Sequence, residues 1–299
     1  MSRLQLTLGP IAYYWSREQV TSFYEEMAQA PLDVAYLGET VCSRRRELRL
    51  ADWLALADDL AAAGKQVVLS SQVLLECEPD VKALRRLADN GRFPVEANDM
   101  GAVRLLGNRV PFVAGPSLNL FNGESLRMLA RLGAVRWVVA PELSAQELAP
   151  MQAERPAGIQ TEVFAYGRVP LAYSARCFTA RHFGLQKDAC DFCCLRFEDG
   201  LRLSTRDGEP FLVLNGIQTQ SDHVQNLIGE LPRLRELGVD ALRISPQARG
   251  TARIVELFRS VLDGAASASS AREAMLEWMP AAGCNGFWHG QPGLAQVAA

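Results

Sequence analysis

Short apolar runs alternate with amphipathic stretches along most of the chain. The runs are β-branched or continuously apolar, as is typical of parallel strands buried on both faces. Eight strands are predicted, at Leu4–Leu8, Val34–Leu37, Gln66–Ser70, Pro94–Glu96, Pro111–Val113, Arg136–Val139, Glu162–Tyr166 and Ala241–Ile244. Helical spacing of apolar residues between them predicts helices at Arg17–Ala30, Ala51–Ala63, Asp80–Asp89, Ser125–Leu132, Ser144–Met151, Val224–Leu237 and Ala252–Leu262.

Eight strands that alternate with helices predict an α/β fold, a (β/α)8 TIM-like barrel that tolerates some distortion. The connection from the seventh to the eighth strand is too long for a plain crossover. It contains most of the cysteines and a hairpin of Leu201–Leu203 with Phe211–Leu214. We therefore expect one barrel domain over residues 1–264, with a cysteine-rich insertion at 167–215. Residues 265–299 begin with the low-complexity run ASASSA, and we expect this tail to pack loosely or on a partner.

Composition argues against several classes of partner and location. The chain has 299 residues, of which 48% are hydrophobic and 22% charged, so it can build a large core. A net charge of −3 does not favour nucleic acid or an anionic membrane as a partner, and the tryptophans show no spacing suited to base stacking. No apolar run approaches the ~20 residues of a transmembrane helix, and the start lacks signal-peptide features. We expect a cytoplasmic protein with no transmembrane segment and no nucleic-acid partner.

The seven cysteines indicate a metal or iron–sulfur site. A reducing compartment and an odd count both argue against a disulfide framework. Cys177, Cys190, Cys193 and Cys194 lie in the long connection. Cys42 follows the second predicted strand, and barrel topology places it at the same carboxyl rim as Cys177. Thiolates suit both zinc and iron–sulfur clusters, and spacing alone does not rank Cys193 against Cys194. Cys77 and Cys284 are expected to be small buried hydrophobes.

Other polar residues indicate a pocket at the carboxyl rim. The candidates near predicted strand ends are Glu96, Asn98, Asn119, Glu142, Tyr166, Arg168 and Arg243. Arg44, Arg45 and Arg46 follow Cys42, and this run is interpreted first as a solvated charged stretch. The alternative is that one or two of the guanidiniums balance cluster charge or bind a carboxylate. No HExxH, GxSxG or P-loop sequence is present, and the three histidines are scattered, so no hydrolase machinery is predicted.

Several segments resemble the UbiV-type members of the peptidase U32 family over nearly the full length. The segments that carry the resemblance are YLGETVCSRRR, GKQVVLS, VPFVAG, VRWVVAPELS, AYGRVPLAYSARCFTAR, KDACDFCC, FLVLNGIQT, LRISPQ and GCNGFW. The resemblance implies a [4Fe–4S] cluster bound by Cys42, Cys177, Cys190 and Cys194, with Cys193 as a neighbour and not a ligand.

The resemblance also implies a function. It suggests a heterodimer with a UbiU-like U32 protein that hydroxylates the aromatic ring of a ubiquinone precursor without oxygen. The chain would be the iron–sulfur component of this system in ubiquinone biosynthesis, and the catalytic residues stay unknown. Two alternatives remain open. One is a zinc-stabilised barrel that acts as a non-redox assembly subunit, and the other is a U32-type peptidase, for which the sequence offers no catalytic set.

Overall fold

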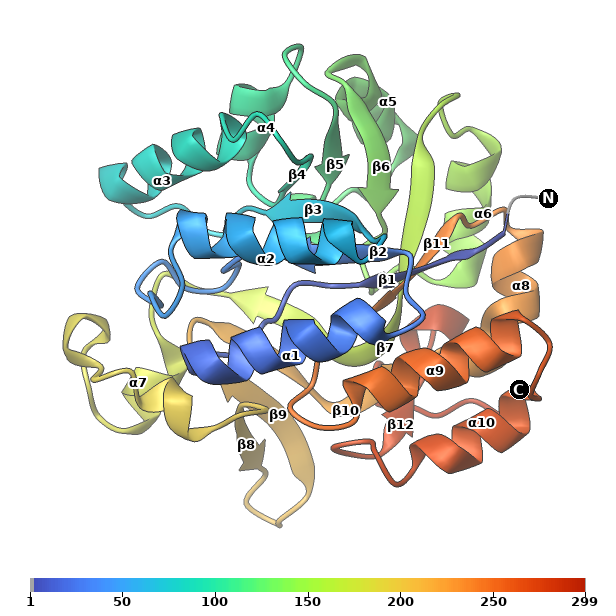
Figure 1. Cartoon of the computed structure of the whole chain (residues 1–299). Helices are drawn as coiled ribbons and strands as arrows, with labels where there is room; N and C mark the ends of the chain where they lie inside the picture. Colours follow the sequence, from blue (N-terminus) through green and yellow to red (C-terminus); the bar gives the residue numbers. More distant parts are fainter. Residues whose placement is uncertain (1–2, 299) are drawn as a thin grey trace.

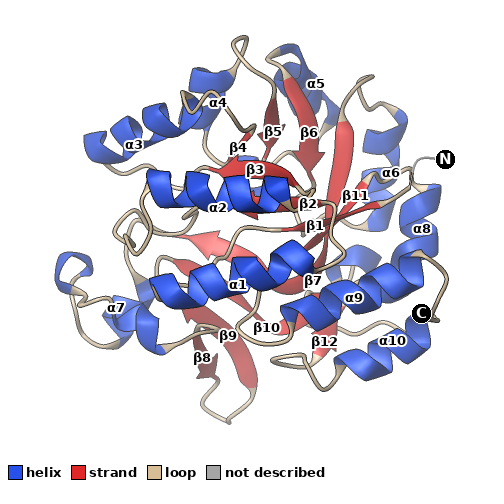
Figure 2. Ribbon diagram, viewed as in Figure 1, coloured by secondary structure: helices blue, strands red, loops and turns tan. Residues whose placement is uncertain are grey.

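The computed structural model describes residues 3–298, and a closed parallel β-barrel ringed by helices lies at its centre (Figures 1 and 2). The strands pair in the order β11-β1-β2-β3-β4-β5-β6-β7, and β7 pairs again with β11, which closes the ring. All eight pairings are parallel. The barrel strands are β1 (Gln5–Leu8), β2 (Val34–Leu37), β3 (Gln66–Ser70), β4 (Val95–Ala97), β5 (Phe112–Ala114), β6 (Ala134–Val138), β7 (Gln160–Tyr173) and β11 (Ala241–Ile244).

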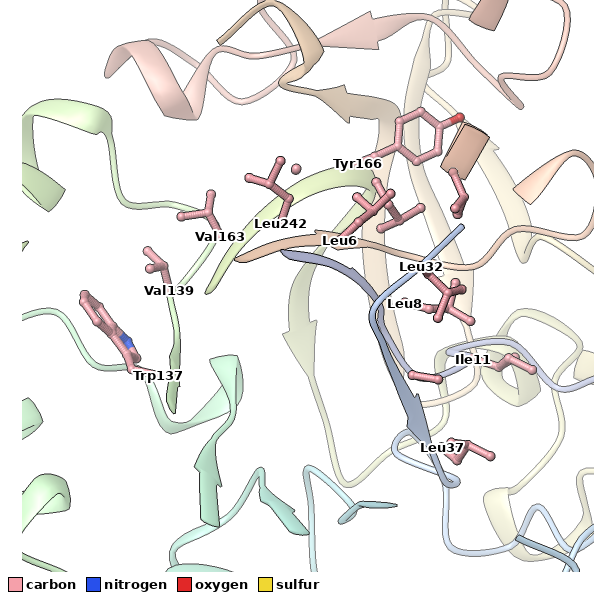
Figure 3. Close-up of a cluster of buried hydrophobic side chains, with 14 of the residues drawn as sticks. Leu6, Leu8, Ile11, Leu32, Leu37, Trp137, Val139, Val163, Tyr166 and Leu242 are labelled. Atoms are coloured by element: carbon pink, nitrogen blue, oxygen red, sulfur yellow. The ribbon is translucent and has the colours of Figure 1, made fainter. Parts of the chain in front are cut away.

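The strands are buried on both faces because each face meets a different core. Side chains alternate along a strand, so one set points into the barrel and the other toward the helices. The inward set includes a small cluster of Val34, Tyr36, Val68, Val113 and Val138. The outward set belongs to the main core under the helices, where strand residues such as Leu6, Val163 and Leu242 lie together (Figure 3).

The barrel helices begin at capping residues encoded in the sequence. Ser16 and Ser144 each form a capping box with the side chain three residues later, Gln19 and Glu147, which satisfies backbone N–H groups at the helix start. The surrounding helices are α1 (Arg17–Gln29), α2 (Leu50–Ala62), α3 (Glu78–Ala88), α4 (Met100–Leu106), α5 (Gly123–Arg131), α6 (Ala145–Ala153), α8 (Leu231–Glu236) and α9 (Thr251–Leu262).

Strand β7 continues beyond the barrel and starts a second, antiparallel sheet. Its carboxyl half pairs with β10 (Gln218–Asn226), which pairs with β9 (Pro210–Asn215) and then β8 (Leu201–Ser204). The segment between β7 and β8 contains the short helix α7 (Phe178–His182) and 3₁₀ turns at Lys187–Ala189 and Cys193–Arg196. This insertion lies beside the β8–β9 hairpin at one end of the molecule (Figure 1).

The structure confirms the predicted barrel, all eight of its strands and the β8–β9 hairpin. The predicted helix at Val224–Leu237 is wrong in its first half. Val224, Leu227, Ile228 and Leu231 do recur at helical spacing and are all buried, but Val224 belongs to β10, where pairing with β7 and β12 overrides the local pattern. The helix begins only at Leu231, where Pro232 occupies its first turn.

The tail after the barrel is ordered and packed, contrary to the expectation of loose packing. Its low-complexity run forms the start of α10 (Ala268–Met275), which begins at the capping residue Ser267. The strand β12 (Gly283–Cys284) then pairs with β10. Met275 is fully buried and Trp288 is 4% exposed, so both belong to the main core. No helix between residues 3 and 298 has the length and apolar character needed to cross a membrane.

Candidate functional site

Three of the predicted ligand cysteines meet in a small buried cluster. Cys42 arrives from the loop after β2, and Cys177 and Cys190 arrive from the insertion after β7. They pack with Val41, Ala180 and Ile217, apart from the main core, and none of the three is more than 9% exposed. Barrel topology therefore brings together thiols that are far apart in the sequence, as the position of the two loops predicts.

Glu39 fixes the loop that carries Cys42. Its Oε1 accepts the backbone N–H groups of Val41 at 3.0 Å and Cys42 at 3.1 Å. Burial raises the pKa of the Glu39 carboxyl, while the Arg45 guanidinium and these N–H donors oppose the shift. The loop is thus held by its own carboxylate and by the arginine that follows it.

The insertion is held against the β9–β10 turn by backbone hydrogen bonds. The N–H of Ser174 donates to Ile217 O at 3.0 Å, and that of Phe178 donates to Gly216 O at 2.8 Å. Cys177 caps the start of α7, and its Sγ accepts the N–H of Ala180 at 3.3 Å. This hydrogen bond orients the thiol and stabilises negative charge on the sulfur.

Two adjacent residues between Cys190 and Cys193 adopt left-handed backbone conformations. Asp191 has φ of 45° and Phe192 has φ of 50°. Such angles are uncommon for residues other than glycine, although aspartate adopts them more readily than most. The turn lets the chain reverse within two residues, so that Cys190 and the following cysteine pair stay close together.

Cys193 and Cys194 face different arginines although they are neighbours in the chain. Burial raises the pKa of both thiols, but Arg45 opposes the shift at Cys194 by charge and a hydrogen bond, whereas Arg196 does so at Cys193. Cys194 therefore adjoins the arginine that also lies beside Cys42. Cys194 is half-buried and does not belong to the buried cluster of Cys42, Cys177 and Cys190.

Arg45 is buried directly beside the thiols. Its Nη1 donates to Ala12 O at 2.7 Å and lies 3.6 Å from the Glu39 carboxylate, and its Nη2 donates to Asn215 Oδ1 at 2.7 Å. The other two arginines of this loop lie elsewhere. Arg44 pairs with Asp188 of the insertion at 2.7 Å, and Arg46 is exposed.

The remaining cysteines do not join this cluster. Cys284 is buried in β12, as expected, whereas Cys77 is exposed at the start of α3, so the expectation that it is buried is wrong. Between residues 3 and 298, no three His, Cys, Asp or Glu side chains lie close enough to hold a single metal ion. The role of Cys42, Cys177, Cys190 and Cys194 as ligands stays a prediction.

A cavity of about 300 Å³ opens at the carboxyl mouth of the barrel. Five of the predicted pocket residues line it, namely Glu96, Asn98, Asn119, Glu142 and Arg243. The prediction is wrong for two others. The Tyr166 hydroxyl donates to Gln247 at 2.8 Å, and the Arg168 guanidinium donates to backbone oxygens of Ser221 and Asp222 in β10.

A buried ionic network lies at the base of the cavity. Arg243 donates to Glu96 at 2.7 Å and to Glu162 at 2.6 Å, and Tyr36 donates to the other oxygen of Glu162 at 2.7 Å. Burial acts to raise the pKa of Glu162, but the guanidiniums of Arg243 and Arg136 outweigh it and lower that pKa. The two carboxylates and two guanidiniums balance in charge.

The sequence interpretation missed the roles of Tyr36, Arg136 and Glu162. A signal for them existed, because each is a polar or charged residue inside an otherwise apolar strand. In a closed barrel such residues must point inward or be paired, since water does not reach them.

The cavity and the cysteine cluster share walls. Ala12 and Tyr173 line the cavity and also pack against the cysteine cluster. Thr40, which lines the cavity too, is two residues from Cys42. A molecule in the cavity would therefore lie one side-chain layer away from the thiols.

The sequence pattern of peptidase family U32 matches residues 15–295. The chain belongs to peptidase family U32. Two curated relatives are tRNA hydroxylation protein P1 of Bacillus subtilis (strain 168) and tRNA hydroxylation protein P of Escherichia coli (strain K12). The first is 28% identical over 152 residues, which is 48% of this chain and 36% of the relative. The second is 20% identical over 261 residues, which is 70% of this chain and 57% of the relative.

The chain thus spans between about a third and just over half the length of these relatives. Solved structures with a similar barrel include the U32 peptidase Mk0906, with a TM-score of 0.45, 12% identity and coverage of 83% of this chain and 94% of that one. Dihydropteroate synthase from Thermus thermophilus has a TM-score of 0.41 at 12% identity, covering 87% of this chain and 94% of that one.

Proposed function

We propose that this U32 protein is the iron–sulfur component of an oxygen-independent hydroxylation system. Cys42, Cys177, Cys190 and Cys194 would hold a [4Fe–4S] cluster at the barrel mouth. The observation that carries the proposal is the meeting of Cys42, Cys177 and Cys190 in one buried cluster that shares Ala12 and Tyr173 with the cavity. When bound, such a cluster supplies one-electron transfer next to whatever the cavity holds.

The donor set suits that group. Four thiols provide the ligand type that iron–sulfur clusters require. The surroundings also counter the negative charge of thiolates, since Arg45 adjoins both Cys42 and Cys194 and the Ala180 N–H points at the Cys177 sulfur. Hydrogen bonds and charges of this kind hold ligands in place and tune the metal group.

We further propose that the substrate is the aromatic ring of a ubiquinone precursor and that a UbiU-like U32 protein is the partner in a heterodimer. Support comes from the near-full-length resemblance to UbiV-type sequences and from membership of the same family. The cavity has room for one ring, and its apolar walls include Phe164, Pro141 and Leu171.

Hydroxylation of tRNA is the second candidate, because both curated relatives carry that name. In that case the cavity would hold a nucleobase that has left its stack, instead of the ring of a quinone precursor. The expectation that nucleic acid is no partner stays a prediction, and the names of the relatives weigh against it. The two candidates share the same cluster and the same cavity.

Iron and sulfide analysis of protein purified without air tests the cluster. We expect a brown protein with about four irons per chain. Alanine at Cys42, Cys177, Cys190 or Cys194 should each lower the iron content several-fold. Cys193→Ala, Cys77→Ala and Cys284→Ala are the matched controls and should keep it. A colourless protein with one zinc would favour the zinc-stabilised alternative, and full iron in Cys42→Ala would refute the fourth ligand.

A deletion strain of a facultative bacterium that encodes this protein separates the two substrates. If the substrate is a ubiquinone precursor, ubiquinone disappears only in cultures grown without oxygen, and hydroxylated nucleosides in tRNA stay at the wild-type level. The opposite pattern would establish tRNA as the substrate. Unchanged levels of both products would rule out the proposed function.

A further inference from the structure

A chain of buried hydrogen bonds runs from Arg45, beside the thiols, to Tyr173 in the cavity wall. Arg45 Nη2 donates to Asn215 Oδ1 at 2.7 Å, and Asn215 Nδ2 donates to Gln218 Oε1 at 2.9 Å. Gln218 Nε2 then donates to the Tyr173 hydroxyl at 2.7 Å. Arg45, Asn215 and Gln218 are at most 4% exposed, so water does not compete along this chain.

The direction of these hydrogen bonds is fixed at the arginine end. A guanidinium has donors and no acceptor, so the atom of Asn215 that meets Arg45 must be the amide oxygen. The Asn215 amide nitrogen then faces Gln218 and requires its oxygen. A second donor, Gln220 Nε2, reaches the same Gln218 oxygen at 3.0 Å and enforces this orientation. The Gln218 nitrogen is therefore left to donate to Tyr173.

Tyr173 consequently uses its hydroxyl oxygen as an acceptor and has its O–H hydrogen left over. Within residues 3–298, no protein atom accepts that hydrogen. Tyr173 is half-buried and lines the cavity, so the hydrogen is available to a molecule bound there. In the free protein water can accept this hydrogen, and a ligand oxygen would take the place of that water.

A second unpaired donor belongs to the same cavity wall. Arg243 is 4% exposed and lines the cavity, and its Nη2 is buried without a hydrogen-bond partner among the described residues. Its Nε and Nη1 are taken by Glu162 and Glu96. The cavity thus combines unpaired donors with walls of proline, leucine and phenylalanine.

We infer that Tyr173 binds the ligand of this cavity by donating its hydroxyl hydrogen to an acceptor oxygen on a ring-sized molecule. The oxygen can be a carbonyl or a carboxylate, and the Arg45–Asn215–Gln218 chain is what keeps Tyr173 a donor. The inference deepens the proposed function, and rests on it only for the biological meaning of the ligand. Binding itself is measurable without turnover.

Acetophenone and α-methylstyrene are suitable probes, because they share one shape and differ in a carbonyl oxygen. Benzoate supplies the carboxylate form. Ligand-observed NMR on the full chain, purified without air, measures the affinity for each. We expect acetophenone or benzoate to bind at least tenfold more tightly than α-methylstyrene. Tyr173→Phe should lower that preference several-fold, and Arg243 accounts for what remains. Tyr24→Phe, which deletes a hydroxyl that donates to Tyr36 O outside the cavity, should preserve it.

Gln218→Glu tests the direction of the hydrogen bonds between Arg45 and Tyr173. The substitution keeps the shape, but an ionised carboxylate only accepts, so Asn215, Gln220 and Tyr173 would all donate to it. Tyr173 would then turn its hydrogen away from the cavity, and the oxygen probe should lose affinity about tenfold although the tyrosine is still present. Circular dichroism and thermal unfolding verify that the variant is folded.

Two results would overturn the inference. One is equal binding of the oxygen probes by the wild-type protein and Tyr173→Phe, and the other is no preference for an oxygen probe over α-methylstyrene. Neither result depends on the iron content or on the phenotype of the deletion strain, which are measured separately. Failure of the Tyr173 inference is therefore distinguishable from failure of the proposed function.

Discussion

At the scale of single residues, the same thiol group has very different surroundings in one chain. Cys77 is exposed at the start of α3, whereas Cys284 is 1% exposed in β12. Burial raises the pKa of Cys284 to about 12 and is the single cause of that shift. Cys42, by contrast, has a guanidinium and a backbone N–H that oppose the effect of burial. Burial still raises the pKa of Cys42, so its polar neighbours reduce the rise and do not reverse it.

The raised pKa of Cys284 predicts a loss of stability at alkaline pH. The unfolded thiol ionises near pH 9 and the folded one near 12, so its contribution is complete below pH 9 and is lost as the pH rises toward 12. The loss at pH 10 is about 1.4 kcal/mol. Urea unfolding at pH 8 and pH 10 should therefore show the wild-type protein losing about that much relative to Cys284→Ala. Parallel losses in the two proteins would contradict the prediction.

At the scale of elements, β7 serves two sheets in succession. Up to Tyr166 it pairs in parallel with β6 and β11, and from Tyr166 onward it pairs antiparallel with β10. Gly167 lies at the change, with φ of 131°. A Cβ there would come within 2.4 Å of the Ser245 Cβ. The strand can redirect itself only because this position has no side chain.

Gly167→Ala should therefore be strongly destabilising. A φ of 131° lies in a region that essentially only glycine adopts, which should cost an alanine about 1–3 kcal/mol, and the clash with Ser245 adds to that loss. Gly158→Ala is the matched control, because Gly158 also has positive φ, at 85°, but has nothing within 4 Å of the added Cβ. Equal free energies of unfolding for the two variants, measured in urea, would show that the clash is relieved at no cost.

The sequence pattern predicts the barrel elements better than those added to it. Strands buried on both faces leave a clear apolar signature, and the position of Cys42 and Cys177 after strands of one barrel places them at one rim. The end of β10 was not predicted, because Val224, Leu227 and Leu231 are spaced as in a helix while pairing with β7 decides the conformation of Val224. The roles of Tyr173 and Gln218 were not predicted either, since they depend on which atoms of an amide face which neighbours.

At the scale of the whole molecule, the tail closes one side of the fold. Helix α10 packs on α9 and on the turn that precedes α8, and Trp288 donates to Glu230 at 3.2 Å (Figure 1). Met275 contributes its side chain to the main core and accepts a hydrogen bond from Asn226 at 3.2 Å. The last residues of the chain thus cover both β10 and the barrel helices.

Met275→Ala should cost about 2–5 kcal/mol, the usual loss for a large aliphatic side chain removed from a core. The neighbouring Leu276 is 66% exposed, and Leu276→Ala should change stability by no more than about 0.5 kcal/mol. Thermal or urea unfolding of the two variants measures the difference. Similar small effects at both positions would show that the tail adds little to the stability of the barrel.

The position of β11 has a consequence for the order of events during translation. This strand closes the barrel between β1 and β7, yet it is encoded after the whole insertion. Until it leaves the ribosome, β1 and β7 each have one unpaired edge. All four proposed ligand thiols precede it by about 50 residues or more, which take about 3–10 s to synthesise. The nascent chain therefore exposes all four of these thiols while the barrel is still open.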